Sequence, residues 1–174
     1  MTLPDSIWEA VRLRALCACE FCGVSEISGG GKFTVDHFRP KSRGGADEAS
    51  NLVYACFRCN IYKADYWSTG GQQSPLWNPR EEPGSKYFAF GDNGQLHPLN
   101  AIGSFSIRQL RLNRPQLVEH RRKRHAEART EELLKRLRSL SSVFNSLLEQ
   151  TADRTVIHQN LLRDLKAVLE LFET

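Results

Sequence analysis

Residues 19–63 read CEFCGVSEISGGGKFTVDHFRPKSRGGADEASNLVYACFRCNIYK. Two CxxC pairs bracket this stretch, Cys19 with Cys22 and Cys56 with Cys59. Thiolates at positions i and i+3 of a tight turn can bind one metal ion together, and two such pairs supply the tetrahedral four-sulfur site of structural zinc. Because residues 23–55 lie between the pairs, the zinc must hold a folded insert, and this insert carries the reactive side chains.

A strand and an acid–base dyad stand near the middle of the insert. Residues 32–35 are partly β-branched and follow three glycines, which predicts a short strand that ends beside Asp36 and His37. Neighbouring side chains on a strand point to opposite faces, so Asp36 can hold a cation while His37 addresses another group. A neutral imidazole beside a metal site can take a proton from water near pH 7.

Oxygen and basic side chains complete the pattern. Asn60 offers an amide oxygen, which a hard divalent cation such as magnesium accepts. Two oxygen ligands from the protein leave coordination positions open, and an open metal site beside phosphate-seeking bases suits phosphodiester hydrolysis. The bases predicted to contact a nucleic-acid backbone here are Arg39, Lys41, Arg43 and Lys63. The alternative for the first three is an ordinary solvated loop.

The spacing of these residues resembles that of the HNH endonucleases, which have the ββα-metal fold, and in particular their branch with four cysteines and Asn at the third signature position. The matching residues are Asp36-His37, Pro40, Ser42, Gly44-Gly45, Asn51-Leu52, Ala55-Cys56, Cys59-Asn60 and Lys63. The resemblance extends upstream to the helix before CEFCG and downstream to Leu76-Trp77-Asn78-Pro79-Arg80 and the basic stretch that ends at Arg122.

This resemblance implies a role for each signature residue. His37 would be the general base that activates the attacking water, and Asp36 and Asn60 would hold one Mg²⁺ or Mn²⁺ against the scissile phosphate. Asn51 would pin the two strands through side-chain to backbone hydrogen bonds and keep His37 aimed. DNA would be cut to 3′-hydroxyl and 5′-phosphate ends, and RNA stays open as a substrate. Many relatives have His where this chain has Asn60, which is an uncharged and weaker ligand.

The segments around the motif predict an α+β fold. Apolar spacing predicts a helix over residues 4–16, a second strand over 52–55 and a helix over 59–67. Residues 87–97 predict a β-hairpin with a Gly/Asn turn. We therefore expect a zinc-stabilised ββα-metal module over residues 1–100, followed by a helical region over 101–174.

The C-terminal region combines a basic segment with a helical hairpin. Residues 108–138 carry 11 Lys or Arg and 4 Asp or Glu, and a net charge of this kind gives sequence-independent affinity for phosphates. Its central cluster is Arg121, Arg122, Lys123 and Arg124, and the alternative is again a solvated face. Helices are predicted from Ser104, from Pro115 and from about Ile157, with an interruption at residues 151–153. Their apolar faces are wider than one partner helix covers, which predicts burial against the rest of the chain, a second copy (a homodimer) or another protein.

Composition narrows the cellular setting. The chain has 174 residues with 40% hydrophobic content and no apolar run long enough for a transmembrane helix. Its first residues lack the basic and apolar regions of a signal peptide. Four of its five cysteines have zinc spacing, which predicts a reducing and therefore cytoplasmic location. The fifth, Cys17, is interpreted as a small buried apolar residue.

Two functions compete with DNA cleavage at this stage. The weak ligand Asn60 is compatible with a zinc-stabilised nucleic-acid-binding module that does not turn over. The helical hairpin is compatible with a subunit that cleaves only in complex with a partner, as would suit a phage-defence nuclease.

Overall fold

The computed structural model describes residues 3–70, 74–150 and 156–171. Packing divides the chain into two compact units, Met1–Arg122 and Lys123–Thr174, and each is considered by itself. The domain boundary predicted at residue 100 stays a prediction. Within the described part of the chain, no helix combines the length and the apolar character needed to cross a lipid bilayer.

The first unit is organised around two antiparallel strands and one helix. Strand β1 (Thr34–His37) pairs with β2 (Leu52–Ala55), and Asp36 lies opposite Val53. All residues of β2 are buried, which fits its unbroken apolar sequence. The pairing of β1 begins two residues later than predicted, because the backbone N–H of Phe33 donates to the Tyr54 hydroxyl (2.8 Å) rather than into the ladder. The dyad therefore lies within β1 and not after it.

Helix α3 (Phe57–Lys63) follows β2 directly, with Cys56 as its N-cap. It begins two residues earlier than predicted and ends four residues earlier. The early end has a backbone cause, since Ala64 has φ of 49° and ψ of −140°, outside the right-handed helical region. This short helix places Cys59 and Asn60 at consecutive positions. Cys59 belongs to a cluster of four cysteines, and Asn60 lines a separate cavity, and both are described below.

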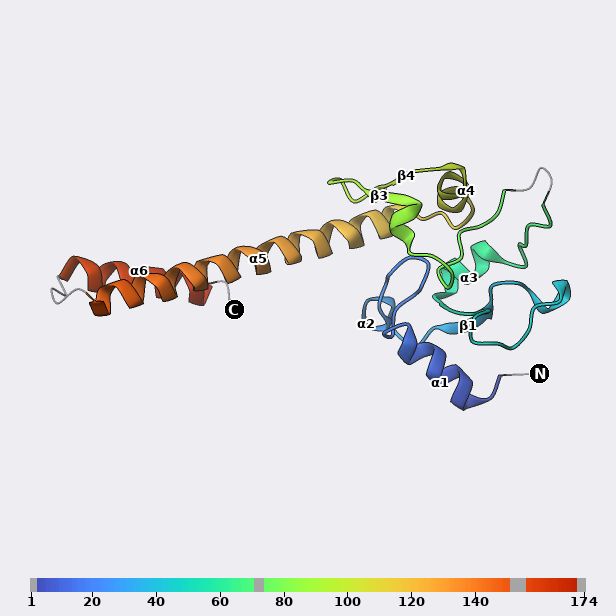
Figure 1. The fold of residues 1–174 in the computed structure, drawn as a ribbon, viewed down its shortest axis with the longest axis horizontal. Helices are drawn as coiled ribbons and strands as arrows, with labels where there is room; N and C mark the ends of the chain where they lie inside the picture. Colours follow the sequence, from blue (N-terminus) through green and yellow to red (C-terminus); the bar gives the residue numbers. More distant parts are fainter. Residues whose placement is uncertain (1–2, 71–73, 151–155, 172–174) are drawn as a thin grey trace. The chain divides into compact units, whose positions relative to one another are not determined.

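Two helices cover one face of the strand pair. Helix α1 (Asp5–Arg14) packs against β1 and β2, and α2 (Glu26–Gly29) lies beside it (Figure 1). Glu26 accepts hydrogen bonds from Arg12 and from the Tyr54 hydroxyl. Arg12 first and Tyr54 second lower the pKa of Glu26 to about 2. This network joins α1, α2 and β2 into one rigid support.

A second small sheet and one helix complete the unit. Strands β3 (Phe88–Phe90) and β4 (Leu96–Pro98) form the predicted hairpin, and α4 (Ala101–Gln109) packs against β4. The Asn100 side chain caps α4 by accepting from the backbone of Gly103. Two 3-10 turns, η1 (Lys41–Arg43) and η2 (Gly84–Lys86), connect these elements. The predicted fold class is confirmed, with small two-stranded sheets, packed helices and a helical C-terminal region.

The second unit contains the distal part of α5 (Pro115–Gln150) and α6 (Val156–Leu171). The two helices pack side by side (Figure 1), and the ring of Phe144 lies 6.2 Å from that of His158. Several large apolar side chains remain exposed on them, namely Leu133, Leu140, Val143, Leu147, Leu161, Val168 and Leu171. The predicted interruption at residues 151–153 lies outside the described residues.

Candidate metal centres

Four sulfur atoms converge beneath the strand pair. Cys19, Cys22, Cys56 and Cys59 place their Sγ atoms within 4.8 Å of one another, and three of the four residues are buried. The Sγ atoms of Cys22 and Cys56 are 3.7 Å apart. Sulfurs bound to one zinc at about 2.3 Å in a tetrahedron lie about 3.8 Å apart, whereas a disulfide needs about 2.05 Å. The spacing therefore fits a zinc ion at the centre of the cluster.

The electrostatics of the cluster call for a cation. Hydrogen bonding with Cys22 raises the pKa of Cys19, and hydrogen bonding with Cys19 raises that of Cys59. Thiols this close cannot all ionise without compensating positive charge. Arg114 supplies part of it, since its Nη2 lies 3.7 Å from Cys59 Sγ and 4.0 Å from Cys56 Sγ.

A second centre lies on another face of α3 and is lined by oxygen atoms. A cavity of about 450 Å³ is bounded by Asp36 and His37 from β1, by Asn60 from α3 and by Asp65 just beyond it. Lys41 and Lys63 also line this cavity. Carboxylate and amide oxygens are the donors that Mg²⁺ and Mn²⁺ prefer. The donor set therefore fits a hard divalent cation and does not fit zinc, which favours sulfur and nitrogen.

His37 is held by a carboxylate outside the signature. Its Nε2 lies 2.5 Å from Asp47 Oδ1, and Lys41 Nζ lies 2.8 Å from the other oxygen, Asp47 Oδ2. Lys41 first and His37 second lower the pKa of Asp47. An ionised Asp47 accepts a proton-bearing Nε2, which fixes the tautomer in which Nδ1 keeps a lone pair. The imidazole is thus oriented by Asp47 through its Nε2 atom.

Asp36 has a buried cationic partner. Its Oδ2 lies 2.8 Å from Lys63 Nζ, and the Lys63 side chain is 1% exposed. The contact is an ion pair by distance, although this buried oxygen accepts no hydrogen bond of good geometry. Lys63 was predicted to contact nucleic acid, but the structure turns it inward, where it neutralises the carboxylate. A metal ion at Asp36 would share that carboxylate with the ammonium.

Asn51 joins the turn after β1 to the start of β2. Its Oδ1 accepts from the Arg39 backbone N–H (2.8 Å), and its Nδ2 donates to the carbonyls of Arg39 (3.1 Å) and Ala46 (2.9 Å). Gly45 must lack a side chain here, because a Cβ would lie 1.8 Å from the Arg39 carbonyl oxygen. The turn that carries Asp47 is therefore fixed to the strand that carries His37.

Comparison with known families agrees with this geometry. Residues 19–65 match the family model of the HNH endonuclease. This segment is an HNH domain. Its four-cysteine cluster assigns it to the zinc-containing branch, as the sequence predicted. Searches of curated proteins and of solved structures gave no match.

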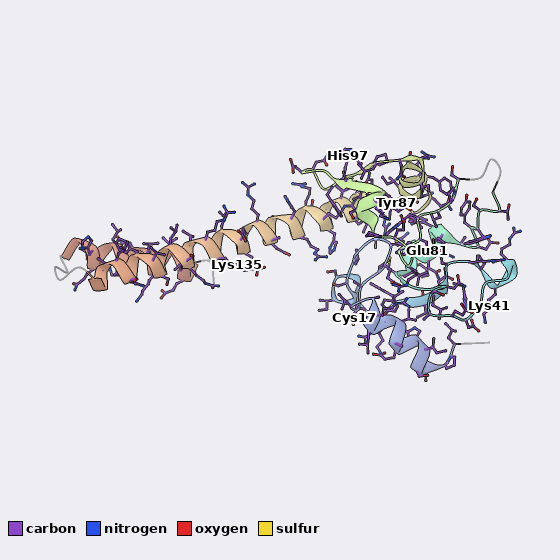
Figure 2. All side chains as sticks on the ribbon, in the orientation of Figure 1. Cys17, Lys41, Glu81, Tyr87, His97 and Lys135 are labelled. Atoms are coloured by element: carbon purple, nitrogen blue, oxygen red, sulfur yellow. The ribbon has the colours of Figure 1, made fainter. Side chains whose placement is uncertain are left out.

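The basic residues predicted to bind nucleic acid differ in whether other groups of the protein already engage their side chains. Arg39 stacks over the Trp67 ring (5.4 Å) and donates to the Arg43 carbonyl. Lys41 pairs with Asp47 (2.8 Å) and lies on the far side of the first unit from Cys17 (Figure 2). Arg121 is half-buried and donates to the carbonyls of Gly94 and Leu112. Arg122 pairs with Glu119 (3.1 Å), and Lys123 and Arg124 are exposed.

Three residues of these centres were missed from the sequence, Asp47, Asp65 and Arg114. Asp47 follows the Gly-Gly turn and Asp65 follows the end of α3, so an acidic residue just outside each signature segment was the available signal. Arg114 lies 55 positions from its nearest sulfur contact, Cys59, and no local pattern marks it.

Proposed function

We propose that the HNH domain is a divalent-metal-dependent nuclease that hydrolyses DNA phosphodiester bonds. The observation that supports this most is the shared cavity, in which an oriented His37 lies beside the oxygen donors of Asp36 and Asn60. A base and a hard-cation site in one open cavity are the two requirements of metal-assisted phosphodiester hydrolysis.

His37 supplies the proton acceptor. Asp47 holds Nε2, so Nδ1 takes the proton of a water molecule as that water attacks the phosphorus atom. Asn51 keeps the strand end and the turn in register, so the imidazole does not swing away. Mg²⁺ or Mn²⁺ held by Asp36 and Asn60, with Asp65 within the same cavity, would stabilise the negative charge that develops on the phosphate and on the leaving oxygen.

The structural zinc has a separate task. It would tie the knuckle that carries Cys19 and Cys22 to the start of α3, where Cys56 and Cys59 lie. Asn60 follows Cys59 directly, so the sulfur cluster fixes the position of one of the oxygen donors. No step of the hydrolysis needs the zinc itself.

The test is plasmid cleavage by the zinc-loaded full chain in Mg²⁺ and in Mn²⁺, with His37→Ala as the matched variant. We expect wild-type protein to nick or linearise the plasmid and His37→Ala to lose about 10²–10⁴-fold in rate, the usual worth of a general base. DNA binding and zinc content should survive the substitution. Wild-type cleavage no greater than that of His37→Ala in both metals would contradict the proposal.

A non-catalytic nucleic-acid-binding module is the second candidate, and the Lys63–Asp36 ion pair favours it. An internal ammonium at the only charged residue of the predicted metal-ligand pair could replace the metal altogether. Under this alternative, Mn²⁺ would not bind the cavity even at millimolar concentration. Electron paramagnetic resonance of Mn²⁺ titrated into wild-type and Asp36→Asn protein separates the two functions without any cleavage assay.

A further inference from the structure

Another cavity of the first unit lies beside the sulfur cluster, which it meets at Cys56 and Arg114, and is separate from the oxygen-lined cavity. It measures about 740 Å³ and lies between the first turns of α3, the glycine loop at residues 29–31 and the segment 111–120. Phe57, Arg58 and Tyr62 of α3 line it, whereas Asn60 of the same helix lines the oxygen-lined cavity. The two cavities therefore use different faces of one helix.

The lining of this cavity contains several basic residues and no Asp or Glu. The basic residues are Lys32, Arg58, Arg111 and Arg114, of which Arg114 lies against the sulfurs of Cys56 and Cys59. Arg58 and Arg111 are exposed, and among the described residues neither forms an ion pair with a carboxylate. A concave surface lined by one sign of charge concentrates positive potential and attracts anions.

Some other surface cations of the chain differ from Arg58 and Arg111 in having a carboxylate partner. Several cations lie within salt-bridge distance of a carboxylate, as Lys86 does with Glu82 (3.0 Å) and Arg136 with Glu132 (3.0 Å). Such pairs leave little net charge for a ligand. Arg58 and Arg111 have no such partner among the described residues, so their charge stays available to a ligand.

Aromatic rings lie beside the charges. The Tyr62 ring is contacted by Arg111 (4.8 Å to the centroid) and by Arg114 (5.7 Å). Phe57 at the edge of the cavity is 68% exposed. Arg111 has φ of 47°, a left-handed conformation that is strained for a residue with a side chain and that clusters at functional sites.

We propose that this cavity binds single-stranded nucleic acid, with Arg58 and Arg111 on the phosphates and Phe57 as a surface on which a base stacks. Basic side chains interleaved with exposed aromatic rings are the means by which proteins hold single strands without sequence preference. A volume of 740 Å³ is in the range of small-ligand pockets, so it admits a nucleotide or two and not a double helix. The inference rests on the proposed function in taking nucleic acid as the ligand, but binding here requires no cleavage.

The experiment measures binding by fluorescence anisotropy in the zinc-loaded full chain carrying His37→Ala, so that cleavage cannot interfere. The probes are a labelled twelve-nucleotide oligothymidylate and a labelled duplex, each at several salt concentrations. Adding Arg58→Ala and Arg111→Ala should weaken oligothymidylate binding at least tenfold. The slope of log affinity against log salt should become shallower by roughly 0.7 for each phosphate that the variant no longer neutralises. Duplex binding should change much less.

The matched control removes the same number of charges from paired cations. Lys86→Ala with Arg163→Ala should leave oligothymidylate affinity and slope unchanged, since each has a carboxylate partner. If the Arg111 substitution impairs folding, Arg58→Ala with Phe57→Ala tests the same cavity through two exposed side chains. Stacking is worth about 1–3 kcal/mol per base, so this pair should also cost at least tenfold.

Competition distinguishes a strand from a free nucleotide. Millimolar pyrophosphate or thymidine monophosphate should displace the oligonucleotide poorly, because each makes only part of the contacts. Displacement at micromolar nucleotide, or equal decreases in affinity in the cavity and control variants, would overturn the proposal. Wild-type plasmid cleavage is scored separately, so a failure of this inference is not read as a failure of the nuclease.

Discussion

The sulfur centre and the oxygen-lined cavity of the first unit use neighbouring residues of α3, Cys59 and Asn60, and differ in almost every physical respect. The sulfur centre is buried and receives its ligands from two tight turns that the zinc itself joins. The oxygen centre is an open cavity in which Asp36 and His37 already have protein partners, Lys63 and Asp47. The first has the closed four-sulfur arrangement of a structural zinc site, whereas the second is open.

This difference shows how a small domain can keep an open site. An exposed cavity with polar walls contributes little to stability. The fold must then be stabilised elsewhere, and the zinc together with the apolar residues around Trp77 and Leu110 does so. Substitutions at the sulfur centre should therefore lower stability, whereas substitutions at the oxygen-lined cavity that leave no buried charge unpaired should lower activity.

The largest effect is expected at the sulfur centre. Cys56→Ser removes a buried zinc ligand that is also the N-cap of α3. Because structural zinc binding is coupled to folding, we expect the variant to lose about one zinc per chain and to unfold or aggregate. Elemental analysis and circular dichroism measure both. Cys17→Ser is the control and should keep its zinc, since Cys17 lies outside the four-sulfur cluster. Zinc loss on changing Cys17 alone would contradict the ligand assignment.

The next largest effect is expected at Asp36, whose ion pair with the buried Lys63 must be taken into account. Asp36→Ala leaves the Lys63 ammonium buried without its carboxylate, which costs on the order of 3–5 kcal/mol of stability. Loss of cleavage in that variant would be ambiguous. The double variant Asp36→Asn with Lys63→Met removes both charges, and we expect it to fold, to retain zinc and to lose cleavage.

The single variant Lys63→Met tests whether the Lys63 ammonium competes with a metal ion for Asp36. If the ammonium competes with the divalent cation for the Asp36 carboxylate, this variant should reach half-maximal cleavage at a lower Mg²⁺ concentration than wild type. If Lys63 instead binds the nucleic-acid backbone, the KM for DNA should rise and the metal dependence should stay the same. Steady-state rates over a grid of Mg²⁺ and DNA concentrations distinguish the two.

The sequence predicted the sulfur centre more completely than the oxygen centre for a physical reason. Zinc geometry imposes the spacing of each CxxC pair, so the ligands could be read from local pattern alone. The partners of His37 and Asp36 depend on how a turn and a helix end fold back on β1. Asp47 reaches His37 only because Asn51 and Gly45 fix that turn, and such a contact leaves no periodic trace.

The boundaries of helices and strands were likewise predicted well where the local sequence determines them and poorly elsewhere. Strand β2 was predicted with its observed bounds, since four buried apolar residues ahead of Cys56 leave little freedom. The predicted helix over residues 59–67 was wrong at both ends, because Cys56 starts it early and the backbone of Ala64 stops it early.

A smaller effect is expected at Arg114, which contacts the sulfur centre but does not line the oxygen-lined cavity. Its guanidinium lies against the Cys59 and Cys56 sulfurs. Burial lowers the pKa of Arg114, but the hydrogen bond to Cys59 and the charges of Cys59, Cys22 and Cys56 together outweigh burial and raise that pKa overall. Groups of this kind typically account for about 10–100-fold in metal affinity. We expect Arg114→Gln to bind zinc more weakly by that order, as measured by competition with a chelator, while Arg122→Gln stays at the wild-type value.

The smallest effect is expected at Asp47, and its size follows from its exposure. In a serine protease triad the buried carboxylate that orients the histidine is worth about 10⁴-fold. The Asp47 side chain is 48% exposed, and exposed ion pairs contribute about 1 kcal/mol or less. We therefore expect Asp47→Asn to lower kcat by no more than about tenfold, with zinc content and the Mg²⁺ requirement unchanged. Asp47→Glu, which can still accept from Nε2, should recover part of the loss. A decrease as large as that of His37→Ala would mean that Asp47 does more than orient the imidazole, and no decrease would mean that Asn51 and the strand alone hold His37 in place.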